Sequence, residues 1–323
     1  MSENNEAFYL DFERPIVELE EKIADIQTQT LKVDGLDLSA EMKGLEEKVE
    51  LMRQEVYTDL TPWQRVQISR HPQRPYTLDY LERIFTDFTE LHGDRAFGDD
   101  HAVVGGPARL DGEPVMVIGM QGGRTAEERQ FRNFGMPHPE GYRKALRLMQ
   151  MAAKFNRPLI HLVDTSGAYP GIEAEERGQA ESIARNLFEM SHLPVPIIVA
   201  IIGQGASGGA LGMAVGDRIL MMENSWYCVI APESCSTILF KTRDRKEEAA
   251  DALKLTAPDL KDQGIIDRII PEPFGGAHRN YDEAAGSLKR LIQEALAELR
   301  PISATELVRQ RVEKYSNMGV WEE

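Results

Sequence analysis

The sequence has few cysteines, no long apolar run and too little positive charge to balance its acids, and each shortage excludes a class of protein. Its 323 residues include two cysteines, Cys228 and Cys235, too few for a four-thiolate zinc site and not in a C-x-x-C spacing. We therefore expect no metal site in this chain. No apolar run approaches the ~20 residues of a membrane-spanning helix. A formal net charge of −16 argues against binding to nucleic acid through charge alone.

The acidity is concentrated at the N-terminal end. Residues 1–60 hold 16 acidic and 6 basic residues, a difference of −10, so the other 263 residues carry only −6. The opening MSENNEAFYL lacks the basic and then apolar pattern of a secretory signal. We expect a cytoplasmic protein that uses neither a membrane nor a nucleic acid as a partner.

The first part of the chain is expected to be helical. Residues 15–30 and 39–56 each carry one apolar stripe at spacings of three and four, and Gly35 lies between them. This pattern predicts a helical hairpin, which is either an ordinary surface feature or an arm that docks onto another chain. A further amphipathic helix is expected to start at Thr77. Residues 1–92 are therefore assigned to an N-terminal helical extension, peripheral to the sheets.

Strands and helices recur after residue 92. Residues 101–110 and 113–120 predict two strands joined by the hairpin signal Asp111-Gly112. Similar pairs of strands precede several later helices. Repeated β-β-α units predict an α/β fold of stacked sheets flanked by helices, in place of a single doubly wound sheet. We assign residues 93–300 to this domain and 301–323 to a helical tail.

The chain is organised around Val195–Val215, which reads VPIIVAIIGQGASGGALGMAV. The β-branched run 195–202 predicts a buried strand, the following glycines a tight turn, and the small residues after them a short helix. The first N–H groups of a helix lack intrahelical partners and favour negative charge. The stretch therefore predicts a place that holds an anion, either a bound phosphate or an oxyanion formed during a reaction.

Four interpretations of these glycines compete. Gly203 to Gly208 fits G-x-G-x-x-G, a dinucleotide fingerprint, with Glu223 downstream. Gly205 to Gly209 fits G-x-S-x-G, a hydrolase elbow with Ser207 as nucleophile. Alternatively, Gly208 and Gly209 donate backbone N–H bonds to an oxyanion without any nucleophile. The glycines can also simply relieve crowding in a turn.

Two of these interpretations have specific weaknesses. A dinucleotide fingerprint opens a long helix early in its domain, whereas only about eight residues separate this motif from Asp217, and it lies in mid-chain. A hydrolase elbow needs an acid and then a histidine downstream, which leaves the triad Ser207, Asp217 and His278 as one hypothesis. A non-catalytic scaffold role is a further alternative.

Longer motifs carry a family resemblance. They are GDRAFGDD, RNFGMPHPEGYRKALRLMQMA, DTSGAYPG, EERGQAESIARNL, IGQGASGGALG and IIPEPFGGAHRN. In these runs the chain resembles the alpha subunit of bacterial acetyl-CoA carboxylase carboxyltransferase. The resemblance covers nearly the whole chain and is weakest over the first sixty residues.

The resemblance implies a crotonase-like (ClpP-like) spiral of β-β-α units and an active site that is shared between two kinds of subunit. In that family the alpha subunit pairs with a beta subunit, two of each, and the active site lies between them. The carboxyl group moves from carboxybiotin on a carrier protein, which a biotin carboxylase charges, to acetyl-CoA, and malonyl-CoA forms. This chain would bind no cofactor alone, and the zinc would belong to the beta subunit.

The resemblance also assigns residues. Gly208 and Gly209 would supply the oxyanion donors that face biotin, with Gly205 and Ser207 beside them. Gly167, Ala168 and Gly171 match the loop that lines the same site. We expect Gly209→Val to lower turnover while leaving the fold intact, and Ser207→Ala to have a mild effect.

Some positions depart from the usual family pattern. Met120 and Gly122 stand where histidine and lysine are common, Ser166 where proline is common and Gln204 where glutamate is common. Nearby arginines, of which Arg124 is the candidate site residue, could compensate by binding phosphate or carboxylate. The other interpretation of these arginines is solvated surface charge.

Overall fold

A seven-stranded sheet forms the centre of the molecule. The computed structural model describes residues 8–32 and 39–319. The strands are β1 (Val103–Leu110), β2 (Glu113–Met120), β3 (Leu159–Thr165), β4 (Ile197–Ala206), β5 (Arg218–Met222), β6 (Trp226–Cys228) and β7 (Arg268–Ile270). Their order is β1-β2-β3-β4-β5-β7, and β6 pairs with β4 off this path. The α/β class is confirmed, and the first two strands match their predicted bounds closely.

Strand pairing explains how the sheet branches. β1 and β2 form the predicted antiparallel hairpin, and the other pairs are parallel. β5 pairs with β4 over residues 198–201, whereas β6 pairs with residues 204–206. The expectation of separate stacked sheets is therefore wrong for the described residues, because β4 is long enough to carry one neighbour on each half.

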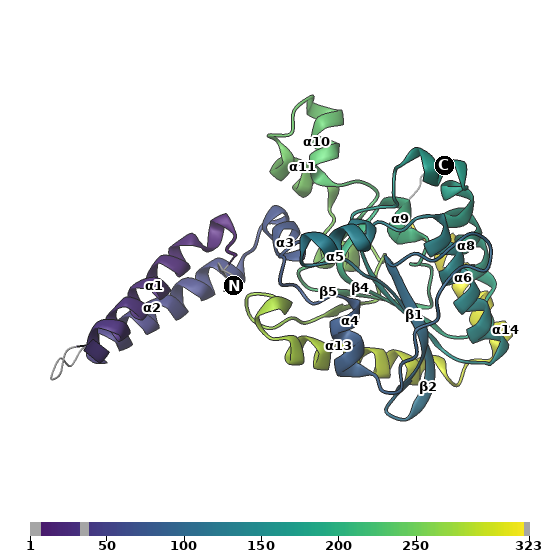
Figure 1. Cartoon of the computed structure of the whole chain (residues 1–323), viewed down its shortest axis with the longest axis horizontal. Coiled ribbons are helices and arrows are strands. Elements are labelled where there is room, and N and C mark those ends of the chain that lie inside the picture. The colour runs from purple at the N-terminus through teal and green to yellow at the C-terminus, as the bar shows by residue number, and fades with distance from the viewer. Residues whose placement is uncertain (1–7, 33–38, 320–323) are drawn as a thin grey trace.

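Helices cover both faces of the sheet (Figure 1). Side chains alternate along β4, so that Ile198, Ala200 and Ile202 enter one core cluster while Ile197, Val199 and Ile201 enter another. The first cluster packs against α4 (Thr77–Ile84) and α13 (Tyr281–Leu299). The second packs against α6 (Pro139–Lys154) and α8 (Gln179–His192). The strand β4, which is buried at every position except Gln204, thus lies at the middle of a three-layer arrangement.

The N-terminal hairpin stands away from this body (Figure 1). It consists of α1 (Arg14–Lys32) and α2 (Ser39–Thr58), and the predicted turn at Gly35 lies outside the described residues. Ile16, Leu19 and Val49 are buried against one another, so the two stripes cover each other in part. By contrast, α4 packs into the main core, contrary to the expectation of a peripheral segment up to residue 92.

The remaining helices connect or cap the strands. They are α3 (Pro62–Ser69), α5 (Ala126–Phe131), α7 (Ile172–Glu176), α9 (Ser207–Leu211), α10 (Pro232–Phe240), α11 (Lys246–Leu253), α12 (Ala257–Asp262) and α14 (Ala304–Ser316). One predicted helix, from about 173 to 193, is divided into α7 and α8 because Gly178 has a left-handed backbone with φ of 83°. In the part of the chain that the structure describes, no helix is both long and apolar enough to cross a membrane.

The helix α14 is held to the body by a buried ion pair. Arg311, 1% exposed, donates from Nε and Nη2 to Asp217 at 2.8 and 2.7 Å. Its remaining N–H groups donate to the carbonyl oxygens of Met190, Leu193 and Val195 at 2.8–2.9 Å. One side chain therefore joins the last described helix to the segment that leads into β4.

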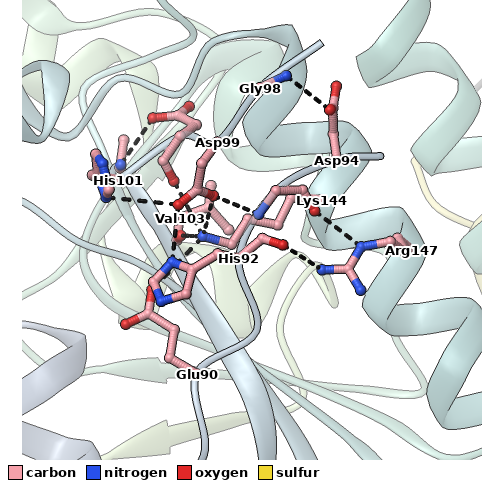
Figure 2. A network of polar contacts seen from close by, with 12 residues as sticks. Glu90, His92, Asp94, Gly98, Asp99, His101, Val103, Lys144 and Arg147 are labelled. Atoms are coloured by element: carbon pink, nitrogen blue, oxygen red, sulfur yellow. Dashed lines mark hydrogen bonds and ion pairs between the residues drawn. The ribbon is translucent and has the colours of Figure 1, made fainter. Parts of the chain in front are cut away.

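A buried lysine fixes the loop between α4 and β1 (Figure 2). The Nζ of Lys144, on α6, donates to Asp99 Oδ1 and to the carbonyl of Val103, both at 2.8 Å. Burial by itself would raise the pKa of Asp99, but N–H bonds from Lys144 and from the Gly93 amide hold that pKa below its usual range. The ion pair between Lys144 and Asp99 thus holds the loop that carries GDRAFGDD against α6.

Candidate functional site

The loop after β3 is built from short-range hydrogen bonds. Thr165 Oγ1 donates to the carbonyl of Gly135 at 2.6 Å and accepts from the Gly167 N–H at 3.1 Å. Gly167 has φ of 140°, which side-chain-bearing residues rarely adopt. Tyr169 stacks on His138 with ring centroids 4.0 Å apart. The predicted lining loop is therefore a rigid feature anchored to the segment before α6.

The strand β4 continues through the glycines that were predicted to form a turn. It ends at Ala206, so the expectation of a turn directly after residue 202 is wrong. A β-carbon on Gly203 would lie 2.6 Å from Asp164 Cγ, and one on Gly205 would lie 2.8 Å from the Tyr227 ring. These glycines let neighbouring groups approach the strand closely.

The short helix α9 begins where β4 ends, and it meets the Gly167 loop. Ser207 takes a left-handed backbone with φ of 59°, which turns the chain into the helix. A β-carbon on Gly209 would lie 2.5 Å from the carbonyl carbon of Gly167 and closer still to the Ala168 nitrogen. The structure thus brings together the two motifs that were predicted to form one site.

The helices α6 and α8 hold α9 from the opposite side. The hydroxyl of Tyr142 donates to the carbonyl of Gly209 at 2.9 Å. The Asn186 amide donates to the carbonyls of Tyr142 and Gly212, each at 3.0 Å. Because both donors are fully buried, the first turn of α9 has little freedom to move.

Gly208 opens onto a cavity of about 340 Å³. A β-carbon there would have only Ile183 Cγ2, at 4.0 Å, as a neighbour. The walls are mainly apolar and come from distant segments, namely Ser207, Leu211, Tyr227, Cys228, Val229, Leu253, Lys254, Leu260, Gln263 and Ile265. Burial raises the pKa of Tyr227 to about 12, so this phenol stays protonated. We call this space the Gly208 cavity.

Of the predicted site residues, Ser207 and Gly208 line the Gly208 cavity, whereas Gly167, Ala168, Gly171, Gly205, Gly209 and Arg124 do not. Gly171 precedes α7. Arg124 donates to Asp79 Oδ2 at 2.6 Å and to the Tyr281 hydroxyl at 3.2 Å. Its guanidinium also lies 5.1 Å from the Tyr76 ring centroid. In this structure Arg124 links α4 to α13.

The hydrolase triad is not assembled. Asp217 is committed to Arg311, as described above, and His278 stacks on His71 with ring centroids 3.9 Å apart. Across residues 8–32 and 39–319, no hydrogen bond joins Ser207 to either of these groups. Ser207 therefore has no base to activate it.

Within the described ranges, no group of three or more histidine, cysteine, aspartate or glutamate side chains could hold a metal ion. Both cysteines are free thiols. The cavity beside α9 is lined mainly by apolar side chains, together with the hydroxyls of Ser207 and Tyr227, the Cys228 thiol, the Lys254 amine and the Gln263 amide.

Sequence analysis missed most of the walls of the Gly208 cavity. Tyr227 and Val229 follow Gly208 by about twenty residues, and Leu253 and Leu260 by about fifty. The β6 pairing to residues 204–206 brings the first two close. One signal for this part of the cavity was present in the sequence, because SWYCVIA predicts a strand. The strand with which it pairs could not be predicted.

The fold is shared with several carboxyltransferases. Transcarboxylase 12S matches with a TM-score of 0.57 and 20% identity over 79% of this chain and 45% of its own. The beta subunit of geranyl-CoA carboxylase from Pseudomonas aeruginosa matches with a TM-score of 0.56 and 18% identity, over 77% of this chain and 46% of its own. The chain thus spans about half the length of these two. These likenesses concern the fold alone, and they confirm the predicted crotonase-like α/β fold.

Comparison with known sequences identifies the family to which the chain belongs. The model of the family described as acetyl co-enzyme A carboxylase carboxyltransferase-like matches residues 9–319. The acetyl-coenzyme A carboxylase carboxyl transferase subunit alpha of Chlorobium phaeovibrioides is 58% identical over 97% of this chain and 98% of its own. The corresponding protein of Geobacter metallireducens is 57% identical over 97% of this chain and 98% of its own. The chain belongs to this family of carboxyl transferase alpha subunits, and the resemblance is confirmed.

Proposed function

We propose that this chain is the alpha half of a split carboxyltransferase that moves a carboxyl group from carboxybiotin on a carrier protein to acetyl-CoA. The observation that carries the proposal is the contact of α9 with the Gly167 loop, which leaves Gly208 facing an open cavity. The similarity to named alpha subunits over 97% of the chain supports the same reaction.

The reaction needs oxyanion donors more than it needs a side-chain base. The methyl carbon of acetyl-CoA loses a proton and attacks the carboxyl carbon, the N–CO2 bond of carboxybiotin breaks, and the biotin nitrogen takes up the proton. Negative charge therefore appears on the enolate oxygen and on the ureido oxygen. A backbone N–H fixed in place stabilises such charge, and one donor is typically worth ~10²–10³ in rate.

The first turn of α9 would provide that donor pair. Gly208 borders the cavity, and Gly209 follows it in the same turn, against Ala168. The buried hydroxyl of Tyr142 fixes this turn through the Gly209 carbonyl. Such preorganisation is what makes an amide an effective oxyanion donor. Ser207, Gly205, Gly167 and Ala168 then serve to shape the site.

A partner chain would complete the site. The family supports a beta subunit, and we propose two alpha with two beta chains, with the zinc on beta. A biotin carboxyl carrier protein and a biotin carboxylase complete the system, in the cytoplasm, and the overall product feeds fatty acid synthesis. We propose that the hairpin of α1 and α2 is a docking arm, since it projects from the body (Figure 1). Leu51 on this hairpin is 63% exposed.

Reconstitution tests the proposal. The chain is mixed with a zinc-bearing beta subunit, and carboxyl transfer from malonyl-CoA to biocytin is measured, with each chain alone as a control. Activity is expected only in the mixture. Malonyl-CoA turnover by this chain alone, or an inactive mixture that co-elutes, would overturn the proposal, and the second result would indicate a scaffold.

A variant of Gly208 tests the assignment of the donor. Gly208→Val places two methyl groups in open space at the mouth of the Gly208 cavity. We expect turnover to fall at least tenfold with an unchanged unfolding midpoint. Gly286→Val, also at a helical glycine with open space around it, is the matched control. Equal activity of both variants would reject the role of Gly208.

A further inference from the structure

Thr165 is the last residue of β3, and it lies where the pairing of β3 with β4 changes register. Val163 pairs with Ile201, and the next pair is Thr165 with Gly205. Over this step β3 advances by two residues and β4 by four. Such irregularities bend a strand and re-aim the side chains at its end. Here the bulge fixes the position of the Thr165 side chain.

The hydroxyl of Thr165 contacts three backbone groups from two segments. Its Oγ1 lies 2.6 Å from the carbonyl oxygen of Gly135 and 2.8 Å from that of Gly167, so its single proton is shared between two acceptors. The same oxygen accepts the Gly167 N–H at 3.1 Å. Because Thr165 is only 2% exposed, loss of the hydroxyl would leave buried polar groups short of a partner.

The two segments that this hydroxyl joins have unusual backbones. Residues 133–135 have φ of 49°, 57° and 73°, and Gly167 has φ of 140°. Sparsely populated conformations of this kind persist only where surrounding contacts hold them. A second contact between the segments is the Tyr169 N–H, which donates to the carbonyl of Pro137 at 3.0 Å. The conformation of the Gly167 loop therefore depends on few hydrogen bonds.

The Gly167 loop in turn supports the first turn of α9. A β-carbon on Gly209 would lie 2.5 Å from the carbonyl carbon of Gly167 and 2.9 Å from its Cα, so the two backbones are in direct contact. On another side, the Tyr142 hydroxyl donates to the Gly209 carbonyl at 2.9 Å. The turn that carries Gly208 and Gly209 is thus held between Tyr142 and the loop that Thr165 organises.

We propose that Thr165 is a positioning residue for carboxyl transfer. Its hydroxyl sets the conformation of the Gly167 loop, and the loop sets the direction of the N–H groups of Gly208 and Gly209. This inference rests on the proposed function, in which those N–H groups stabilise an oxyanion. Misplacement of such a group by ~1 Å can lower a rate by ~10²-fold.

The variant Thr165→Val tests the role, because valine keeps the shape of threonine and removes the hydroxyl. The variant is assembled with the zinc-bearing beta subunit, and carboxyl transfer from malonyl-CoA to biocytin is measured. We expect kcat to fall at least about tenfold while the KM for malonyl-CoA changes less than about twofold, since the lost interaction acts in the transition state. An unchanged kcat would overturn the proposal.

The conservative variant Thr165→Ser should rescue the activity. Serine keeps the hydroxyl and loses only the methyl group, so we expect kcat within about threefold of the parent value. If Thr165→Ser is as slow as Thr165→Val, the methyl group is the important part and the proposal fails.

Thr77→Val is the matched control for loss of stability. Thr77 is fully buried, and its hydroxyl also donates to a carbonyl, that of Met120, at 2.6 Å. Among the described residues this hydroxyl bonds to neither the Gly167 loop nor α9. The two valine variants should lose similar stability in urea, but only Thr165→Val should lose kcat. An equal fall of kcat in Thr77→Val would show that destabilisation alone explains the effect, and would overturn the proposal.

Hydrogen exchange of the chain alone gives a measurement that is independent of activity. The amides of residues 166–171, which include the bonded Tyr169 N–H, should exchange at least severalfold faster in Thr165→Val than in the parent or in Thr77→Val. Unchanged exchange would show that the loop does not depend on the hydroxyl, and would reject the proposal.

A second variant covers a failure of Thr165→Val to fold. A β-carbon on Gly167 would meet nothing within 4 Å, but alanine rarely adopts φ of 140°, so Gly167→Ala should shift the loop with the hydroxyl in place. We expect a lower kcat. Gly112→Ala, in the exposed hairpin at φ of 83° with open space around it, is the control. Parental activity of Gly167→Ala would reject the role of the loop.

The outcomes separate this role from the proposed function. An inactive mixture of the parent chain with the beta subunit would reject the proposed function, and the role of Thr165 in catalysis with it. An active parent mixture beside an equally active Thr165→Val mixture would reject the role of Thr165 and leave the proposed function intact.

Discussion

Gly209 lies so close to Ala168 that no side chain fits between them. A β-carbon on Gly209 would be 2.9 Å from the Gly167 Cα and closer still to the Ala168 nitrogen. The expectation that Gly209→Val leaves the fold intact is therefore wrong, because backbone atoms cannot give way cheaply. A change at Gly209 perturbs the Gly167 loop as well as the donor turn.

Gly209→Ala is accordingly expected to destabilise the chain. Overpacking in a close-packed region typically costs ~1–3 kcal/mol. Urea unfolding of the isolated chain measures this, with Gly208→Ala as the control because its β-carbon meets only Ile183 at 4.0 Å. The control should stay within about 0.5 kcal/mol of the parent. Equal midpoints for the two variants would contradict the close contact.

Ser207→Ala should have only a small effect on carboxyl transfer. The hydroxyl has no basic partner in the described structure, and the residue serves to turn the backbone at φ of 59°. We expect turnover of the assembled enzyme to change by less than about threefold, well below the ~10²-fold of a lost oxyanion donor. A serine-directed fluorophosphonate probe should not label the parent chain. Labelling at Ser207 would restore the hydrolase hypothesis.

Arg311→Met is expected to be strongly destabilising. It leaves the Asp217 carboxylate buried without its partner, a change that typically costs ~3–5 kcal/mol. Arg309→Met is the matched control on the same helix, since Arg309 pairs with Glu306 at 2.7 Å on the exposed side. Exposed pairs of this kind contribute little to stability, because solvent screens their charges. Urea unfolding compares the midpoints of the two variants with that of the parent. Similar midpoints for Arg311→Met and Arg309→Met would show that the buried pair is not needed for stability.

The stacked histidines predict a loss of stability in mild acid. Burial lowers the pKa of His278 to about 2, and it also lowers the pKa of His71. The His278 ring is therefore neutral in the folded chain near pH 5, whereas a histidine in the unfolded chain takes up a proton below a pKa of about 6.5. The contribution of the neutral His278 ring to the free energy of unfolding is complete above that pKa. It decreases as pH falls, by roughly 2 kcal/mol between pH 7 and pH 5.

The variant His278→Phe tests this dependence. It keeps an aromatic ring on His71 and removes the titrating group, so its unfolding midpoint should fall less between pH 7 and pH 5. The charged groups that face the stack, Glu13, Arg74 and Arg279, are present in both proteins. His192→Gln, at an exposed position, is the control. An unchanged pH dependence in His278→Phe would exclude the stack as its source.

Sequence patterns predicted the elements that local rules determine. The Asp111-Gly112 hairpin, the helix that starts at Thr77 and the apolar stripes of α1 and α2 all appear as expected. Each depends on residues that are near in sequence. The pairing of the DTSGAYPG loop with α9 followed from a family resemblance, and the structure supplies its physical basis in the Gly209 contact.

Other features depend on partners that the sequence does not reveal. Gly203 and Gly205 resemble turn residues, yet they lie in a strand because Asp164 and Tyr227 approach them. Whether a glycine serves a turn or a close contact is decided by residues about forty and twenty positions away.

The reach of Arg311 has a consequence for synthesis on the ribosome. The carbonyl groups just before β4, and the Asp217 carboxylate after it, receive their N–H bonds from a residue roughly a hundred positions later. During translation those groups emerge well before their donor does. The carbonyl groups before β4 and the Asp217 carboxylate therefore stay hydrogen-bonded to water until α14 has left the exit tunnel. Final consolidation of the nascent chain is a late event, set by its last helix.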